Sequence, residues 1–349
     1  MTITTLGGNS KLRTRLLFSP TFQRMHRWMD QRVLRLRRDV RRAAIIEVTQ
    51  ADGQRRTQTI EMVKAPLEEA RGQVGAYRLI SVLGRGGMGE VYLGEHVETG
   101  ARTAVKVLHA GLSASAEFRA RFRREARTLR TLCHPNILGI VDYGIDRDSF
   151  YMALEVIDGV TLADYLVEVK QMPLEQSLQV IEDVAAALDH AHAKGIVHRD
   201  VKPRNVMLRR QSQDGALSAV LMDFGIVKWL EGTASMVGTL TSGGMIGTVD
   251  YAAPEQITAA HDVDSRADIY ALGMMAYLMM TGRLPFKGSV GQVVFAHLQQ
   301  QPPDPHLINP ALPVRAADAI VRALAKMPES RFRTAGEFAA ALRLGVRTA

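Results

Sequence analysis

Three polar side chains with the chemistry for phosphoryl transfer lie close together between Val197 and Asn205. Asp200 supplies a carboxylate that can accept a proton, and Lys202 supplies an ammonium that can neutralise a phosphoryl oxygen. Asn205 supplies an amide oxygen that can hold a divalent metal ion. Phosphoryl transfer depends mainly on positioning and charge stabilisation, so this spacing fits it. The rest of the chain must then supply a nucleotide cradle, a second metal ligand and a place for the substrate.

A glycine-rich turn between two expected strands is the candidate nucleotide cradle. Residues 77–83 predict one strand, and Val91-Tyr92-Leu93 predict a second. The glycines of the turn let the backbone approach phosphates and direct its N–H groups at them. They are Gly84, Gly86, Gly87 and Gly89. A dinucleotide-binding turn of this kind opens a helix instead, so we predict a strand–turn–strand flap over phosphates. A glycine-rich hairpin without a ligand is the alternative.

A lysine and two acids are the candidates for the remaining parts of the site. Lys106 alternates with apolar neighbours in the expected strand 103–108, which turns its ammonium into the lobe. A buried ammonium needs a partner, and Glu125 is the acid on the apolar face of the expected helix 114–132. We therefore predict an ion pair between Lys106 and Glu125. Asp223 ends an expected strand and is followed by Phe224 and Gly225, so it is a candidate metal ligand, with an ordinary turn residue as the alternative.

Six motifs of the chain occur in one order. They are Gly84-x-Gly86-x-x-Gly89-x-Val91, Ala104-Val105-Lys106, Glu125, His198-Arg199-Asp200-x-Lys202-Pro203-x-Asn205, Asp223-Phe224-Gly225 and Ala253-Pro254-Glu255. In this order they resemble the eukaryotic-type serine/threonine protein kinase family in its bacterial form, over about residues 77–345. The resemblance implies an α+β, two-lobed protein kinase fold. Residues 75–156 would form a small, mostly antiparallel β-sheet N-lobe with one key helix, and residues 157–346 a larger, mainly helical C-lobe.

The resemblance implies a role for each matching residue in the cleft. Asp200 would accept or orient the proton of the substrate hydroxyl, and Lys202 would stabilise the γ-phosphoryl group. Asn205 and Asp223 would hold Mg²⁺, with Mn²⁺ as an alternative, and oxygen ligands suit such ions. Lys106 would orient the α- and β-phosphates of ATP. The residues that would surround the nucleotide are Leu83, Gly84, Arg85, Gly86, Gly87, Met88, Gly89, Glu90, Val91, Ala104, Glu155 and Ile157.

The resemblance also assigns residues outside the cleft. Asp268 would anchor the catalytic loop from a buried helix, and Arg331 would pair with Glu255. Thr248 would contact the catalytic residues. Arg199 would clamp a phosphorylated residue of the activation segment, because a phosphate adds charge and acceptor oxygens that can order a loop. The candidates for autophosphorylation are Thr239, Thr241 and Ser242. A flexible loop that is never modified is the alternative.

The implied activity is transfer of the γ-phosphoryl group of ATP to Ser or Thr hydroxyls of protein substrates in a signalling pathway. The residues that match the serine/threonine class are Lys202 and Thr248. The main alternative is an ATP-binding scaffold without activity, but the residues that such proteins usually lack are present. They are Lys106, Asp200 and Asp223. A metabolite kinase of related fold is a third reading, and the intact segment 247–255 favours a protein substrate over it.

Residues 1–74 form a basic N-terminal extension outside the resemblance. The net charge of the chain is +8, and residues 1–42 contribute +9 of it through eleven Lys and Arg against two acids, so the rest is near neutral. An apolar stripe at steps of three and four predicts an amphipathic helix over 21–46, and residues 45–63 predict a small hairpin. Residues 65–74 are the expected linker, with the main boundary near residue 75.

Several uses of this basic helix stay open. We rank packing on the protein's own body first, self-association or docking of a partner second, and peripheral contact with an anionic membrane third. Nucleic-acid binding is not favoured, because no reading motif accompanies the charge.

Cysteine content and hydropathy indicate the compartment. The single cysteine, Cys133, excludes a disulfide framework and a cysteine-based metal site, and it suits a reducing cytoplasm. The longest apolar run, 269–280, is interrupted by Gly273 and is shorter than the ~20 residues that a spanning helix needs. We find no signal peptide. The sequence therefore predicts a cytoplasmic protein without a transmembrane segment.

Overall fold

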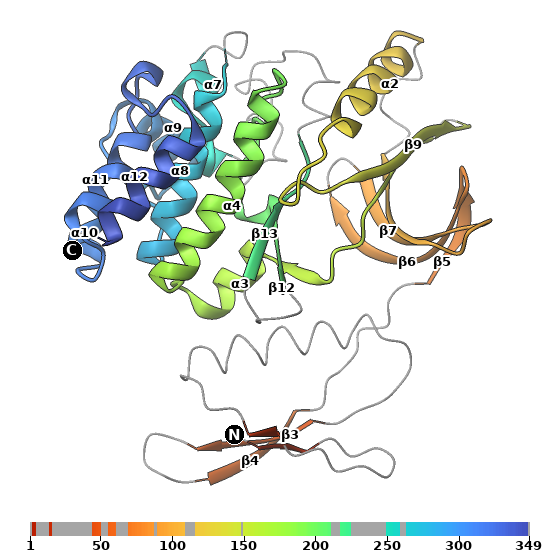
Figure 1. Ribbon diagram of the computed structural model, residues 1–349, viewed down its shortest axis with the longest axis horizontal. Coiled ribbons are helices and arrows are strands. Elements are labelled where there is room, and N and C mark those ends of the chain that lie inside the picture. The colour runs from red at the N-terminus through yellow and green to blue at the C-terminus, as the bar shows by residue number, and fades with distance from the viewer. Residues whose placement is uncertain are drawn as a thin grey trace. The chain divides into compact units, whose positions relative to one another are not determined.

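The computed structural model describes residues 69–86, 89–108, 116–147, 149–210, 217–224, 249–258 and 263–347, together with short strands nearer the N-terminus. The chain divides into two compact units, residues 1–69 and 70–349 (Figure 1). Several residues that the sequence singled out lie outside the described residues. They are Gly87, Met88, Gly225, Thr239, Thr241, Ser242 and Thr248.

The N-terminal unit holds a four-stranded sheet in the order β2-β1-β3-β4. The strands are β1 Thr2–Thr4, β2 Thr14–Arg15, β3 Ala44–Thr49 and β4 Arg55–Ile60. β3 and β4 pair antiparallel, which makes a hairpin in the region where the sequence suggested one. The helix predicted over 21–46 is wrong at its end, because Ile45 and Ile46 belong to β3, and β-branched residues favour extended backbone. The remainder of that prediction, residues 21–43, lies outside the described residues.

A six-stranded sheet in the order β5-β6-β7-β8-β10-β9 begins the second unit. The strands are β5 Glu69–Val74, β6 Tyr77–Gly86, β7 Gly89–His96, β8 Arg102–Leu108, β9 Ile140–Asp146 and β10 Ser149–Leu154. The pairings from β6 through β7, β8 and β10 to β9 are antiparallel. This sheet confirms the mostly antiparallel N-lobe.

Strand β5 occupies residues that the sequence suggested as a linker. Val74 is buried, and the N–H of Gly75 donates to Asp146 Oδ2 at 2.9 Å. Gly75 has a φ of 54°, and a Cβ on it would lie 2.3 Å from the hydroxyl oxygen of Tyr151. The turn after β5 is therefore held against β9 and β10. The second compact unit begins at residue 70 and so includes most of β5.

The two faces of the N-lobe sheet pack differently, and this places Lys106. On one face, Val105 packs in a cluster with Tyr77 and Tyr151. On the other face, Leu108 packs with Phe122 of helix α2 (Ala116–Arg130). Because side chains alternate along a strand, Lys106 lies on the same face as Leu108, the one covered by α2.

The C-lobe is mainly helical, as the sequence predicted. Its helices are α3 Leu162–Val169, α4 Leu174–His192, α7 Pro254–Thr258, α8 Arg266–Thr281, α9 Val290–Gln299, α10 Pro305–Ile308, α11 Val314–Ala323 and α12 Ala335–Arg347. A three-stranded sheet accompanies them, with β11 Gly159–Thr161, β12 Val206–Arg210 and β13 Leu217–Leu221. Figure 1 shows the helices gathered on one side of the second unit and the β5–β10 sheet on the other. The second unit therefore has the two-lobed protein kinase fold.

Helix α8 is the centre of the C-lobe core. Residues on all sides of it are buried, including Ile269, Tyr270, Leu272 and Met275. A helix that is apolar all round packs inside a protein or a membrane. Within the described ranges, no helix combines the length and apolar content needed to cross a bilayer.

Candidate active site

The loop between α4 and β12 carries the three residues that the sequence selected for chemistry, and it is anchored by Asp268 of α8. Asp268 is 1% exposed. Its Oδ2 accepts from the backbone N–H of His198 and its Oδ1 from that of Arg199, both at 2.8 Å. His192 Nε2 lies 2.8 Å from the same Oδ2. A buried carboxylate is stable when its oxygens are bonded in this way, so Asp268 holds the loop to α8.

Within the loop, the three candidate side chains contact one another. Lys202 Nζ lies 2.8 Å from Asp200 Oδ2. Asn205 Nδ2 donates to the backbone oxygen of Asp200 at 2.8 Å and to its Oδ2 at 3.0 Å. Because the amide nitrogen of Asn205 is used by Asp200, the amide oxygen is left as an acceptor. This geometry brings a proton acceptor, an ammonium and an oxygen ligand to one place.

Asp223 is held beside this loop by its neighbours. The N–H of Met222 donates to the backbone oxygen of Asn205 at 2.8 Å, and His198 Nε2 lies 2.8 Å from the oxygen of Met222. The ring of Phe224 lies 4.6 Å from that of His198, centroid to centroid. Asp223 itself has a φ of 52°, a strained conformation of the kind that clusters at functional sites.

Lys106 and Asp223 form an ion pair across the two lobes. Lys106 Nζ lies 2.6 Å from Asp223 Oδ1, and the lysine side chain is only 16% exposed. The predicted ion pair between Lys106 and Glu125 is therefore not formed. Glu125 does lie on the inner side of α2, at 15% exposure, but its Oε1 pairs with Arg124 Nη2 at 3.2 Å. Lys106 is thus paired with Asp223, and Glu125 with its chain neighbour Arg124.

The glycine-rich turn joins β6 and β7. Gly84 pairs with Val91 and Gly86 with Gly89 across the two strands, which is the strand–turn–strand arrangement expected. A Cβ on Gly84 would meet nothing within 4 Å, so a ligand could approach its backbone closely. A Cβ on Gly89 would lie 2.1 Å from the oxygen of Val107, so this glycine is also required for packing against β8.

The connection between the lobes, residues 155–158, has backbone groups available for a ligand. Glu155 N–H donates to the oxygen of Gly139 at 3.1 Å. In the part of the chain that the structure describes, the Glu155 C=O and the Ile157 N–H have no backbone partner. These are the two groups expected to meet the edge of an adenine ring.

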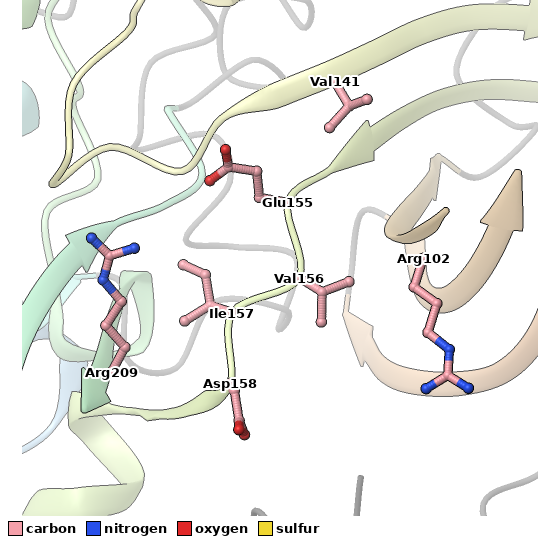
Figure 2. A pocket seen from close by; sticks show the side chains of 7 residues that line it. All are labelled: Arg102, Val141, Glu155, Val156, Ile157, Asp158 and Arg209. Carbon is pink, nitrogen blue, oxygen red and sulfur yellow. The ribbon is translucent and has the colours of Figure 1, made fainter. Parts of the chain in front are cut away.

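A pocket of about 400 Å³ opens on the same connection (Figure 2). It is lined by Arg102, Val141, Glu155, Val156, Ile157, Asp158 and Arg209. Figure 2 shows the two arginines on either side of the connecting segment. Leu83, Val91 and Ala104, which are expected around the adenine ring, do not line it, so this pocket and the expected nucleotide site share only the connection.

Arg331 and Glu255 form the ion pair that the family resemblance implied. Arg331 Nη1 and Nη2 lie 2.6 and 2.7 Å from Glu255 Oε1 and Oε2, and the arginine side chain is fully buried. The same guanidinium donates to the backbone oxygens of Arg266, Ala325 and Lys326. A bidentate, fully bonded pair of this kind fixes α7 to the core.

The residues present fit Mg²⁺ and a nucleotide. Mg²⁺ is usually held by one or two carboxylates together with substrate phosphates and water. Asp223 and the free amide oxygen of Asn205 match that pattern. No group of three or more His, Cys, Asp or Glu residues gathers as a metal cage among the described residues, so no competing all-protein site is present there. Gly84, Glu155 and Ile157 supply the open backbone that a nucleotide would use.

Two contacts of the site were not anticipated from the sequence. His192 contacts Asp268, and it stands at the end of α4 without any spacing signal. Gln256 donates to the backbone oxygen of Arg199. It is the third residue of a helix that begins at Pro254, a position from which a Gln side chain commonly reaches back to the N-cap. That pattern could have marked Gln256 as a structural residue.

Comparison with known proteins identifies the family of the chain. Residues 77–336 match the family model of the protein kinase domain. The chain is 43% identical over 291 residues to serine/threonine-protein kinase Pkn1 of Myxococcus xanthus, covering 81% of this chain and 40% of that protein. It is 35% identical over 271 residues to serine/threonine-protein kinase PrkC of Bacillus subtilis, covering 77% of this chain and 40% of that protein.

The solved structures give the same result. The kinase domain of PknI of Mycobacterium tuberculosis is similar, with a TM-score of 0.63 and 33% identity over 80% of this chain and all of that one. The match to the curated relatives spans about 40% of their length. The chain therefore belongs to the protein kinase family, in its bacterial eukaryotic-type serine/threonine form.

Proposed function

We propose that the chain transfers the γ-phosphoryl group of ATP to Ser or Thr hydroxyls of protein substrates. The observation that supports this most strongly is the grouping of Asp200, Lys202 and Asn205 on a loop anchored by Asp268. The similar bacterial proteins are named as serine/threonine-protein kinases. The loop contains each residue type that the chemistry needs: a carboxylate, an ammonium and an amide.

The proposed mechanism assigns one task to each residue. The hydroxyl oxygen of the substrate attacks the γ-phosphorus while its proton passes to the Asp200 carboxylate, and ADP leaves. Lys202, 2.8 Å from Asp200, is placed to neutralise charge that develops on the transferred group. Asn205 and Asp223 would hold Mg²⁺, which neutralises phosphate charge when bound. Lys106 would orient the phosphates once Asp223 releases it, and Glu125 would then be its partner.

The deciding experiment measures label transfer from γ-labelled ATP to a protein substrate in Mg²⁺ buffer. Asp200→Asn removes the proton acceptor, and we expect a loss of about 10²–10⁴-fold in kcat. Lys106→Met should also lose activity. Lys287→Met, an exposed lysine outside the site, is the matched control and should retain it. Equal incorporation by wild type and the Asp200→Asn variant would defeat the proposal and favour an inactive scaffold.

Autophosphorylation belongs to the same proposal. Thr239, Thr241 and Ser242 are the candidate acceptors, and Arg199 is the candidate clamp for the phosphate that they would carry. Mass spectrometry of active protein, with Asp200→Asn as control, tests it. An active enzyme that carries no phosphate on this segment contradicts it.

The location and partners are proposed in the same way. ATP and the exposed, unpaired Cys133 support a reducing cytoplasm. For the basic extension we rank packing on the protein's own body first, and the second-ranked roles, self-association and partner docking, can be tested directly. Because β5 begins at Glu69, a deletion to test this should stop at residue 68. An unchanged mass in solution and unchanged partner capture after that deletion would remove the extension from both roles.

A further inference from the structure

We propose that Gln256 is a positioning residue for the catalytic loop: its side-chain amide joins the substrate-side helix α7 to the peptide bond that precedes Asp200. Gln256 Nε2 donates to the backbone oxygen of Arg199 at 3.0 Å. Its Oε1 accepts from the N–H of Ala253 at 3.0 Å. Both ends of one amide are thus used, and they join two segments that are 57 residues apart in the chain. The inference rests on the proposed phosphoryl transfer.

The carbonyl that Gln256 contacts belongs to a residue in an unusual conformation. Arg199 has a φ of 63°, which is unfavourable for a residue with a side chain and persists only where the surroundings hold it. Asp268 accepts the N–H of Arg199, and Gln256 donates to its C=O. The next N–H, that of Asp200, donates to His198 Nδ1 at 3.2 Å. The N–H and C=O of Arg199 and the N–H of Asp200 are therefore all bonded, and Gln256 supplies the bond to the C=O.

Helix α7, which carries Gln256, is held firmly by its neighbours. Glu255 of this helix is held at both oxygens by Arg331, which is fully buried. Pro254 and Ile257 on the same short helix are also buried. Since α7 cannot shift easily, the amide of Gln256 sets where the Arg199 carbonyl lies, and through the following peptide it sets the direction of Asp200. α7 begins within the segment 247–255, which the family resemblance ties to a protein substrate, so the contact links substrate placement to the proton acceptor.

The competing explanation is that Gln256 only caps α7. In a capping box, the side chain of the third helical residue accepts from the backbone N–H of the N-cap residue. Gln256 Oε1 accepts from the Ala253 N–H in this way. Capping needs an acceptor at Oε1 and does not need the donor at Nε2. The two explanations therefore separate on a single substitution that keeps the acceptor and removes the donor.

Gln256→Glu is that substitution. At pH 8 a carboxylate still accepts from Ala253 but cannot donate to Arg199, so we expect kcat to fall by roughly threefold to tenfold, the usual worth of one hydrogen bond. The KM for ATP and the melting temperature should stay near those of wild type. Protonation of the new carboxyl toward pH 5 restores a donor, so the ratio of variant to wild-type kcat should rise as pH falls. The native ionisable groups near the Gln256–Arg199 contact are Asp200, Lys202, His198, Asp268 and His192. They are present in both enzymes, so dividing the kcat of the variant by that of wild type at each pH cancels their contribution.

Two further variants complete the test. Gln256→Met loses both bonds and should lower kcat and the melting temperature together. Gln300→Glu, the same change at an exposed glutamine, should alter neither. A Gln256→Glu enzyme with wild-type kcat at pH 8, or a ratio that does not depend on pH, would overturn the inference and leave capping as the role.

A readout without catalysis keeps this inference separate from the proposed function. Hydrogen exchange of the peptide that spans residues 197–205 should be faster in Gln256→Glu than in wild type at pH 8, because the loop has lost a bond. An inactive wild type with that faster exchange would reject phosphoryl transfer but keep the positioning contact. Unchanged exchange with an unchanged kcat would reject the contact alone.

Discussion

Acid should destabilise the second unit through His297 of α9. This residue is fully buried, and its Nδ1 lies 2.8 Å from the hydroxyl of Tyr270. The ring of Phe286 is 5.1 Å away, centroid to centroid. Burial is the main cause that lowers the pKa of His297 from 6.5 to about 4; the charge of Lys326 acts in the same direction, and a hydrogen bond with the backbone of Asp250 acts in the opposite direction. The folded protein therefore keeps this imidazole neutral well below the pH at which it would be protonated in the unfolded chain.

The sign and size of the effect follow from these two pKa values. Between pH 6.5 and about 4, the unfolded chain binds a proton that the folded chain does not. The contribution to stability is thus complete above pH 6.5 and is lost as pH falls through this window. At 1.36 kcal/mol per pKa unit the whole loss is about 3 kcal/mol, and by pH 4.5 about 2.5 kcal/mol of it has gone. That is a large share of the roughly 5–15 kcal/mol that holds a folded domain together.

Urea denaturation of wild type and His297→Asn at pH 7.5 and 4.5 measures this loss. Asparagine can still accept from Tyr270 but cannot be protonated. The variant should be less stable than wild type at pH 7.5, because it packs less well. It should then lose about 2.5 kcal/mol less than wild type on going to pH 4.5.

The control is Gln300→Asn, at an exposed residue without a titratable side chain, which should lose as much stability as wild type on acidification. Parallel losses in wild type and His297→Asn would refute the reasoning, since the acid sensitivity would then come from other groups.

Two further substitutions test contacts that hold the fold. Gly75→Ala should destabilise the second unit by at least about 1–3 kcal/mol, because its φ is positive and its new methyl group would meet Tyr151. Gly72→Ala, whose Cβ meets nothing within 4 Å, is the control and should be close to neutral in thermal denaturation. Arg331→Met should cost about 3–5 kcal/mol in urea denaturation, because it leaves Glu255 without its partner. Adding Glu255→Gln should recover part of that loss, and a double variant no more stable than the single one would contradict the ion-pair explanation.

The grouping of the three catalytic-loop side chains was predictable from the sequence, but the pairing of Lys106 with Asp223 was not. Asp200, Lys202 and Asn205 are within six residues of one another, so short-range geometry alone brings them together. Periodicity also gave the inward faces of Lys106 and Glu125. It does not give the distance between β8 and α2, which depends on how the aromatic side chains of the helix pack against the sheet. That distance decides whether Glu125 reaches Lys106.

Strand β5 and Gln256 escaped prediction for a related reason. β5 is an edge strand, and such strands often carry polar and charged side chains. Its sequence, Glu-Ala-Arg-Gly-Gln-Val, is mostly polar and does not alternate regularly between apolar and polar residues, although its last residue, Val74, is buried. What makes it a strand is the backbone of β6, which the local sequence does not display. Gln256 likewise has a local pattern that explains its bond to Ala253. Its second bond, to Arg199, depends on where two distant segments meet.

The contacts of the site differ between the lobes in a way that bears on how it works. On the C-lobe side, Asp200 and Asn205 sit on a loop bonded to the buried Asp268. On the N-lobe side, Lys106 pairs with Asp223, which lies beside this loop and whose side chain is 42% exposed. A partly exposed ion pair contributes little to stability and exchanges partners at low cost. Adjustment to a bound nucleotide should therefore fall on Lys106 and α2, while the proton acceptor keeps its place.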